Sequence, residues 1–301
     1  MTNYQIIKKR NIWLSVSSAL FVIAIIALAL WKLKLGIDFT GGSLLEVKFY
    51  PNRPEVAQIE KKLADLNLGS LLVQPVGDKN ILLRFQNTSE EKHQEASGRL
   101  REIAQENNNQ AEEIVFNSVG PSIGQELKRK SVAAIFWVFI AIVIYISIVF
   151  RKISRPVASW KYGLSALIAM FHDVIITLGV FAVLGEFYGA EINTPFVAAI
   201  LTVLGYSIHD TIVVFDRVRE NLPKSDLDFE GTVNMSLNQT LIRSINTSLT
   251  VIIALLAILI FGGPSIRTFA LALTIGIFIG TYSSIFVASP LLVIWENFKK
   301  N

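Results

Sequence analysis

Two residues that can carry charge, Asp210 and Arg243, lie inside long apolar stretches of the sequence. A charged side chain within lipid is costly, so such residues usually face the interior of a helix bundle. An arginine beside a buried aspartate keeps the carboxylate charged, and movement of the arginine away makes protonation possible. The pair therefore predicts a proton-binding site. The alternative interpretation is a static salt bridge that fixes helix packing.

The two residues are predicted to lie at similar depth in a membrane. Asp210 is about six residues from the inner end of its apolar run, or ~9 Å, and Arg243 is about five residues into the next run. Each helix is expected to carry a narrow polar stripe, and the stripes are expected to face each other. The stripes consist of Thr202, Tyr206 and Asp210 on one helix and of Arg243, Asn246 and Thr250 on the other.

A second polar pair, His172-Asp173, lies near the middle of another apolar run, and the same dipeptide recurs as His209-Asp210. Adjacent helical residues point about 100° apart, so only one of each pair can face a given partner squarely. Hydrogen bonding between helices is one interpretation of His172 and Asp173, and a supporting part in proton movement is the other. The spacing does not fit a metal site, so no metal is expected.

The composition indicates which elements must hold these residues. Of the 301 residues, 52% are hydrophobic and 17% are charged, against ~25% charged in a typical globular protein. The absence of cysteine excludes a disulfide scaffold and thiol catalysis. A net charge of +4 predicts no nucleic-acid partner without a basic patch. The chain is therefore expected to be an integral membrane protein with a soluble part.

Six apolar runs approach the ~20 residues that a membrane-spanning helix needs. The first resembles a signal peptide, but its run is too long for one, and we interpret it as an uncleaved anchor. In the last run Gly276, Gly280 and Ser284 predict a close helix–helix contact. The six runs are Asn11–Leu30, Ser131–Phe150, Tyr162–Leu184, Thr194–Phe215, Asn238–Phe261 and Thr268–Trp295.

Basic residues accumulate on one side of the six predicted spans, which predicts that both termini are cytoplasmic. The short loops on the opposite side carry Glu186, Glu191 and only one basic residue, Arg267. The basic residues on the inner side are Lys8, Lys9, Arg10, Arg151, Lys152, Arg155, Lys161, Arg217, Arg219, Lys224, Lys299 and Lys300.

Between the first two spans, residues 36–127 are expected to form a domain outside the cytoplasm, with spans in 1–35 and 128–301 on either side. The pattern of apolar residues follows the order β-α-β-β-α-β, which is the order of a ferredoxin-like α+β fold. The predicted strands are Ser43–Tyr50, Leu71–Val76, Ile81–Phe85 and Ala111–Val119, and the predicted helices are Glu55–Leu66 and Ser89–Glu106.

Two glycine-rich segments connect this domain to the spans. We expect either a pair of shaped turns that set the pose of the domain or hinges for its motion. The context does not fit a phosphate-binding loop. The candidate hinge residues are Gly36, Asp38, Gly41 and Gly42 in the first segment and Gly120, Pro121 and Gly124 in the second.

The chain closely resembles the SecD/SecF family of the bacterial Sec export machinery, which is related to proton-driven RND exporters. The resemblance rests on motifs spread over the whole sequence. They are GIDFTGG (Gly36–Gly42), VGPSIGQEL (Val119–Leu127), HDV (His172–Val174), GYSIHDTIVVFDRVREN (Gly205–Asn221) and TLIRSIN (Thr240–Asn246).

The resemblance implies a multi-pass helical membrane protein with six spans, half of an RND-type bundle, in the bacterial plasma (inner) membrane. It implies SecD as partner, association with the SecYEG channel and YajC, and unfolded preproteins as substrates after SecA has acted. Asp210 and Arg243 match the positions that the family uses for proton transport. The family contains transporters rather than enzymes, with the proton as coupling ion and no cofactor.

Two other functions stay open at this point. A half-size RND-type exporter of small molecules would share the proton chemistry, but its full form would need a second outer domain and about twelve spans. A non-transporting membrane scaffold would not depend on Asp210 at all.

Overall fold

The computed structural model describes residues 4–86, 89–149 and 158–297 and divides the chain into two compact units. One unit comprises residues 1–34 and 133–301, and the other comprises residues 35–132. Several basic residues used to predict the orientation lie outside the described residues, as does Phe150, the predicted end of the second span. These basic residues are Arg151, Lys152, Arg155, Lys299 and Lys300.

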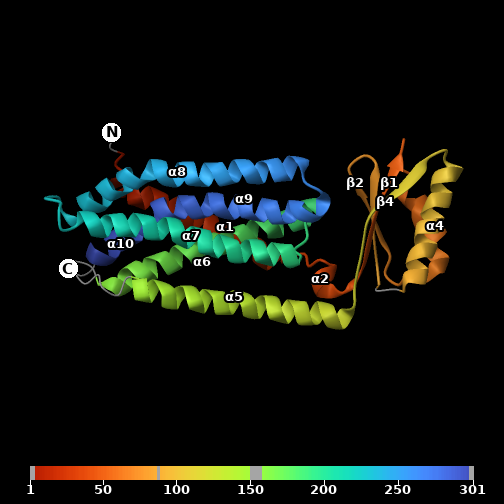
Figure 1. Cartoon of the computed structure of the whole chain (residues 1–301), viewed down its shortest axis with the longest axis horizontal. Coiled ribbons are helices and arrows are strands. Elements are labelled where there is room, and N and C mark those ends of the chain that lie inside the picture. The colour runs from red at the N-terminus through yellow and green to blue at the C-terminus, as the bar shows by residue number, and fades with distance from the viewer. Residues whose placement is uncertain (1–3, 87–88, 150–157, 298–301) are drawn as a thin grey trace. The chain divides into compact units, whose positions relative to one another are not determined.

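The first unit is a helix bundle (Figure 1). In the described part of the chain, six helical segments are long and apolar enough to cross a membrane, which confirms the six predicted runs. The segments are longer than the runs because their polar ends continue the helices. The helices are α1 (Arg10–Trp31), α5 (Pro121–Val149), α6 (Ser159–Tyr188), α7 (Thr194–Asn221) and α8 (Phe229–Phe261), followed by α9 (Pro264–Ser283) and α10 (Ser289–Asn297).

The sixth segment is interrupted by a π-helical turn, Ser284–Ala288, between α9 and α10. Pro290 lies just beyond this turn. Its ring nitrogen cannot donate to the carbonyl four residues earlier, which is that of Phe286 within the turn. The hydroxyl of Ser289 donates to the carbonyl of Ser284, five residues earlier, at 3.1 Å. A π-helical turn of this kind widens the helix locally and often marks a functional site.

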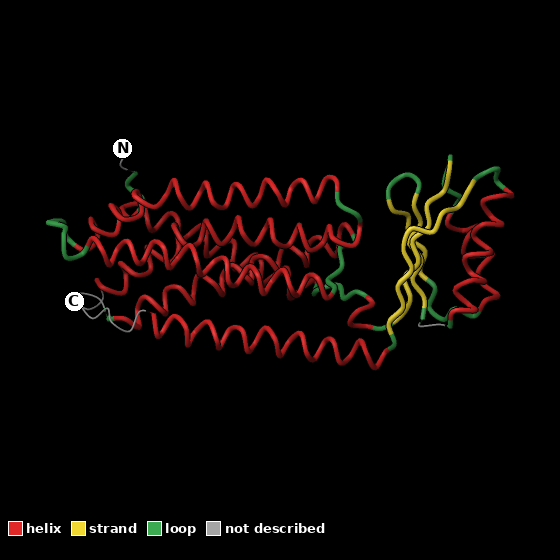
Figure 2. The backbone as a smooth tube through the Cα atoms, in the orientation of Figure 1, coloured by secondary structure: helices red, strands yellow, loops and turns green. Residues whose placement is uncertain are grey.

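The second unit contains an antiparallel sheet, drawn in yellow in Figure 2. The sheet has four strands in the order β2-β3-β1-β4. Its helices α3 and α4 pack on one face of the sheet around buried Leu45, Ile59, Leu83 and Leu100. This order and packing agree with the predicted ferredoxin-like arrangement. The elements are β1 (Gly42–Tyr50), α3 (Val56–Leu63), β2 (Leu72–Val76), β3 (Asn80–Phe85), α4 (Glu90–Glu106) and β4 (Gln110–Val119).

The two glycine-rich segments pack against each other within this second unit. The first forms a short helix, α2 (Ile37–Thr40), followed by Gly41 at a φ of +74°. A side chain at Gly41 would place its Cβ 2.8 Å from the Cα of Pro121, and one at Gly124 would lie 2.9 Å from the nitrogen of Gly41. These glycines therefore permit close backbone packing.

The second glycine-rich segment is not a turn. Pro121 is the first residue of α5, a position at which proline is common because its missing N–H would have no helical partner there. The expectation of two shaped turns is therefore wrong for this segment, which forms the first turns of a 29-residue helix. The hinge hypothesis stays a prediction.

Candidate functional site

Asp210 is buried in the bundle, where its side chain is 3% exposed, and hydroxyl groups surround it. The hydroxyl of Ser248 on α8 donates to Oδ2 of Asp210 at 3.5 Å and lies 2.5 Å from the hydroxyl of Thr281 on α9. Tyr206, one turn earlier on α7, donates to the same serine at 3.1 Å. Thr281 is a further hydroxyl partner of this carboxyl group. A carboxyl group held by neutral hydroxyl groups, one of them at 3.5 Å, exchanges a proton without losing a charged partner.

The prediction that Arg243 faces Asp210 is wrong in this chain. Ser244 and Ser248 are the buried polar residues of this part of α8, whereas Arg243, Asn246 and Thr250 are exposed. Among the described residues no ion pair joins Asp210 to Arg243. The reason is helical periodicity, because Arg243 is turned about 100° from Ser244. Sequence spacing placed Arg243, Asn246 and Thr250 on one side of α8, but that side is exposed and does not pack on α7.

The exposed polar residues of α8 have counterparts on α7. Thr202, Gly205 and His209 recur along an exposed side of α7, and a side chain at Gly205 would meet no atom within 4 Å. The hydroxyl of Thr202 donates to the carbonyl of Ala198 in its own helix. Together with Arg243 and Asn246, these residues form an uncovered polar surface, which we call the α7–α8 polar face.

Asp173 on α6 forms a second polar cluster and is completely buried. Its Oδ2 accepts hydrogen bonds from Ser207 on α7 at 2.5 Å and from Ser283 on α9 at 2.6 Å. Its Oδ1 lies 2.9 Å from Nδ1 of His172, while Nε2 of this histidine is buried without a partner among the described residues. Asp173 thus joins three helices through side-chain hydrogen bonds.

The close contact predicted for the last span is confirmed. A side chain at Gly276 would place its Cβ 2.2 Å from Val203, and one at Gly280 would lie 3.2 Å from Ser207, both on α7. Ser284 bonds the hydroxyl of Thr211 at 2.8 Å. The absence of side chains at the two glycines brings α9 close enough to α7 for these short hydrogen bonds.

Sequence reasoning missed the serine and threonine partners of both aspartates. Ser207 follows Tyr206, but it lies off the predicted stripe, and Ser283 lies next to the predicted glycine face. The recurrence of hydroxyl residues beside Gly276 and Gly280 was a usable signal, because small polar residues bond across tightly packed helices. In the described part of the chain no group of three or more metal-ligating side chains occurs.

Residues 99–298 match the family described as "Protein export membrane protein SecD/SecF, C-terminal", and residues 32–49 match "SecD/SecF GG Motif". The second match covers the glycine-rich segment that includes α2. The first covers two thirds of the chain and includes both aspartates.

Similar proteins named "Protein translocase subunit SecF" occur in several bacteria. The chain is 43% identical to that of Thermobaculum terrenum and 39% identical to that of Anaerolinea thermophila, over 97% of this chain and 94% of each relative. Among solved structures, SecDF from Thermus thermophilus, titled a translocon-associated membrane protein, matches with a TM-score of 0.82 at 34% identity. That match covers 98% of this chain but 39% of the SecDF chain.

Proposed function

The chain belongs to the SecD/SecF family of protein export membrane proteins, and from this we propose that it uses the proton-motive force to promote preprotein export. The names of its relatives agree with the general role of a membrane subunit in protein transport. In the proposed cycle the chain acts with SecD on preproteins that emerge from SecYEG after the ATP-driven step of SecA. The observation that carries the proposal is the buried carboxyl of Asp210, which the hydroxyl groups of Ser248 and Thr281 hold.

Arg243 supports the same proposal from its exposed position. An arginine that faces lipid is costly, so a second protein is expected to cover the α7–α8 polar face. We propose that this protein is SecD, with YajC as a further member of the complex. The match to SecDF is consistent with this, since 39% of that chain corresponds to the present one and the remainder is free to supply the cover. In such a complex the proton site includes groups from both subunits.

A photo-crosslinking amino acid at Asn246, on the α7–α8 polar face, is expected to capture a SecD-type subunit in intact membranes. The matched control is the same amino acid at Ile23, which is 60% exposed on α1. We expect at least about fivefold more of the SecD-type subunit to be crosslinked at Asn246 than at Ile23. This ratio corresponds to a difference of roughly 1 kcal/mol in the free energy of contact. The measurement is the mass of the crosslinked product. Equal capture at both positions in an assembled complex contradicts the proposed interface.

We also propose that the bundle end at which α1 begins and α10 ends faces the cytoplasm, because Lys8, Lys9, Arg10 and Lys161 lie there. The chain contains no cysteine, so single cysteines report orientation directly. A cysteine at Asp78, in the turn between β2 and β3, is expected to react with a membrane-impermeant maleimide in intact spheroplasts. A cysteine at Asp226, between α7 and α8, is expected to react only after permeabilisation. The reverse labelling would overturn the orientation.

A further inference from the structure

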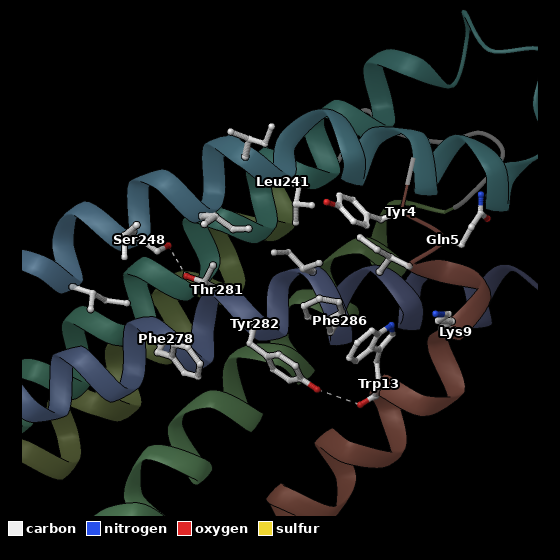
Figure 3. Close-up of a pocket in the computed structure, with 16 residues that line it drawn as sticks. Tyr4, Gln5, Lys9, Trp13, Leu241, Ser248, Phe278, Thr281, Tyr282 and Phe286 are labelled. Carbon is white, nitrogen blue, oxygen red and sulfur yellow. Dashed lines mark hydrogen bonds between the residues drawn. The ribbon is translucent and has the colours of Figure 1, made fainter. Parts of the chain in front are cut away.

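An open groove of about 740 Å³ lies between the start of the chain, α8 and α9 in the helix bundle (Figure 3). Its volume falls within the ~300–1,000 Å³ of typical ligand pockets. Its walls are almost entirely apolar. The apolar residues that line the groove are Ile6 and Trp13 at the start of the chain, Leu241, Ile245 and Ile252 on α8, and Phe278, Tyr282 and Phe286 on α9.

The groove has one polar end. Tyr4, Gln5 and Lys9 lie together there, and Phe278 lies at the opposite end (Figure 3). Lys9 is exposed and makes no ion pair with any residue that the structure describes, whereas its neighbour Arg10 is paired with Glu230 at 2.7 Å. The amine of Lys9 is therefore available to an anionic group.

Hydrogen bonds to α8 hold this polar end in place. The backbone of Tyr4 both donates to and accepts from the side-chain amide of Asn238, at 2.8 and 3.0 Å. The backbone nitrogen of Ile7 donates to Asn234 at 3.2 Å. The segment that carries Lys9 is thus fixed against α8, and the groove between them is part of the folded chain.

The length of the groove matches one leaflet of a membrane. Its α8 wall runs from Leu241 to Ile252, a rise of eleven steps, or about 16 Å at ~1.5 Å per residue. Half of the ~30 Å hydrocarbon core of a bilayer is about 15 Å. Lys9, just before α1, lies at the end where a lipid headgroup is expected.

One side of the groove lies away from the proposed subunit interface. Ile252 follows Arg243 by nine residues, which at about 100° per residue places the two on opposite sides of α8. Ile242 and Ile245, which also line the groove, adjoin Arg243 and Asn246, so the other edge of the groove lies next to the α7–α8 polar face. A subunit that covers this face leaves the part of the groove around Ile252 open to lipid.

We propose that this groove binds one anionic phospholipid, with an acyl chain between α8 and α9 and its phosphate beside Lys9. Basic residues next to gaps between membrane helices recognise anionic headgroups in this way. The floor of the groove contains Ser248 and Thr281, the hydroxyl pair that holds Asp210. The bound chain therefore shields that pair from the surrounding membrane. The lipid site stands independently of the proposed transport role.

The test uses fluorescence of Trp13, which lines the groove, in the full complex reconstituted into vesicles. The other four tryptophans, Trp31, Trp137, Trp160 and Trp295, are replaced by Phe. Brominated phosphatidylglycerol is expected to quench Trp13 more strongly than brominated phosphatidylcholine at equal mole fraction. Lys9→Gln is expected to lower this preference about fivefold, which corresponds to ~1 kcal/mol for one lysine near a lipid surface.

Lys8→Gln is the matched control, because it removes the same charge from the adjacent residue, which lines a different hollow. It is expected to leave the preference unchanged. Native mass spectrometry of the complex with all tryptophans intact provides a second measurement, in which Lys9→Gln loses bound phosphatidylglycerol and Lys8→Gln retains it. The proposal is overturned if neither lipid quenches Trp13, which would place protein in the groove. It is also overturned if brominated phosphatidylglycerol and brominated phosphatidylcholine quench Trp13 equally. The same holds if Lys9→Gln and Lys8→Gln have the same effect on the preference.

Discussion

Asp210→Asn is expected to abolish proton-driven stimulation of export while leaving the chain folded and assembled. Asparagine has nearly the shape of aspartate but cannot take up a proton. The hydroxyl groups of Ser248 and Thr281 can also bond the amide oxygen of asparagine, so the effect on stability should be about 0.6 kcal/mol. We expect the stimulated rate to fall about tenfold or more, a loss of at least ~1.4 kcal/mol of coupling.

The measurement is preprotein export into inverted membrane vesicles, with and without an uncoupler that removes the proton-motive force. Asp216→Asn is the matched control. It makes the same chemical change on the same helix, but Asp216 is half exposed and pairs with Arg219, three residues later, at 3.3 Å. Its stimulated export should equal that of the unaltered chain. Recovery of the SecD-type partner in equal amounts separates a coupling defect from an assembly defect.

Undiminished stimulation in an assembled Asp210→Asn complex would refute the proton-binding role. A loss shared with Asp216→Asn would show that the assay responds to the charge of α7 in general. Arg243→Leu provides an independent test in the same export measurement. If the arginine controls the charge of Asp210 across the subunit interface, this variant should also lose stimulation, although it lies on an exposed face of α8.

Asp173→Leu is expected to destabilise the helix bundle more than any single change at the Asp210 cluster. Ser207, Ser283 and His172 would lose the oxygen atoms that they now bond, within a site that excludes water. Each hydrogen bond between membrane helices contributes ~0.6–1.7 kcal/mol, so the two bonds from Ser207 and Ser283 predict a loss of about 1–3 kcal/mol. The measurement is the free energy of unfolding of the purified complex, by denaturant titration in mild detergent.

Smaller changes at the same cluster serve as controls. Ser207→Ala and Ser283→Ala each remove one donor and should each cost about 1 kcal/mol, while leaving Asp173 in place. Asp173→Asn keeps one oxygen and should fall between these variants and Asp173→Leu. If Asp173→Leu unfolds at the same denaturant concentration as the unaltered chain, the cluster does not hold α6, α7 and α9 together. In that case a role in proton movement becomes the better interpretation of Asp173.

The two aspartates differ in a way that explains these expectations. Ser207, Ser283 and His172 bond Asp173 at 2.5–2.9 Å, whereas Ser248 bonds Asp210 at 3.5 Å and Asp210 lies beside the α7–α8 polar face. A group that is fully hydrogen-bonded resists a change of charge or position. A group with few partners changes its protonation at lower cost, as a coupling site requires.

Much of the fold follows from local patterns. The six spans were predictable because an apolar run of ~20 residues satisfies its backbone only as a helix in lipid. The strands of the second unit were predictable because alternate residues such as Leu45 and Val47 face one core. Tertiary packing was also predictable at Gly276 and Gly280, since small residues four apart permit close approach.

The π-helical turn was harder to predict. Pro290 indicates that one hydrogen bond is missing, but a kink or a break would satisfy the same condition. Ser284, the first residue of the turn, bonds Thr211 of α7, a contact between residues 73 apart in the chain that local sequence does not reveal.

By itself the sequence determined the number of spans, the α+β order of the second unit and the presence of intramembrane charges, because each depends on residues close together in the chain. The tertiary structure decided which faces of the helices meet. It turned Ser248 rather than Arg243 toward Asp210 and placed Asp173 among three helices. It also left a groove beside Lys9. A helical period identifies a stripe of residues, but the neighbour that covers the stripe is set by the packing of distant segments.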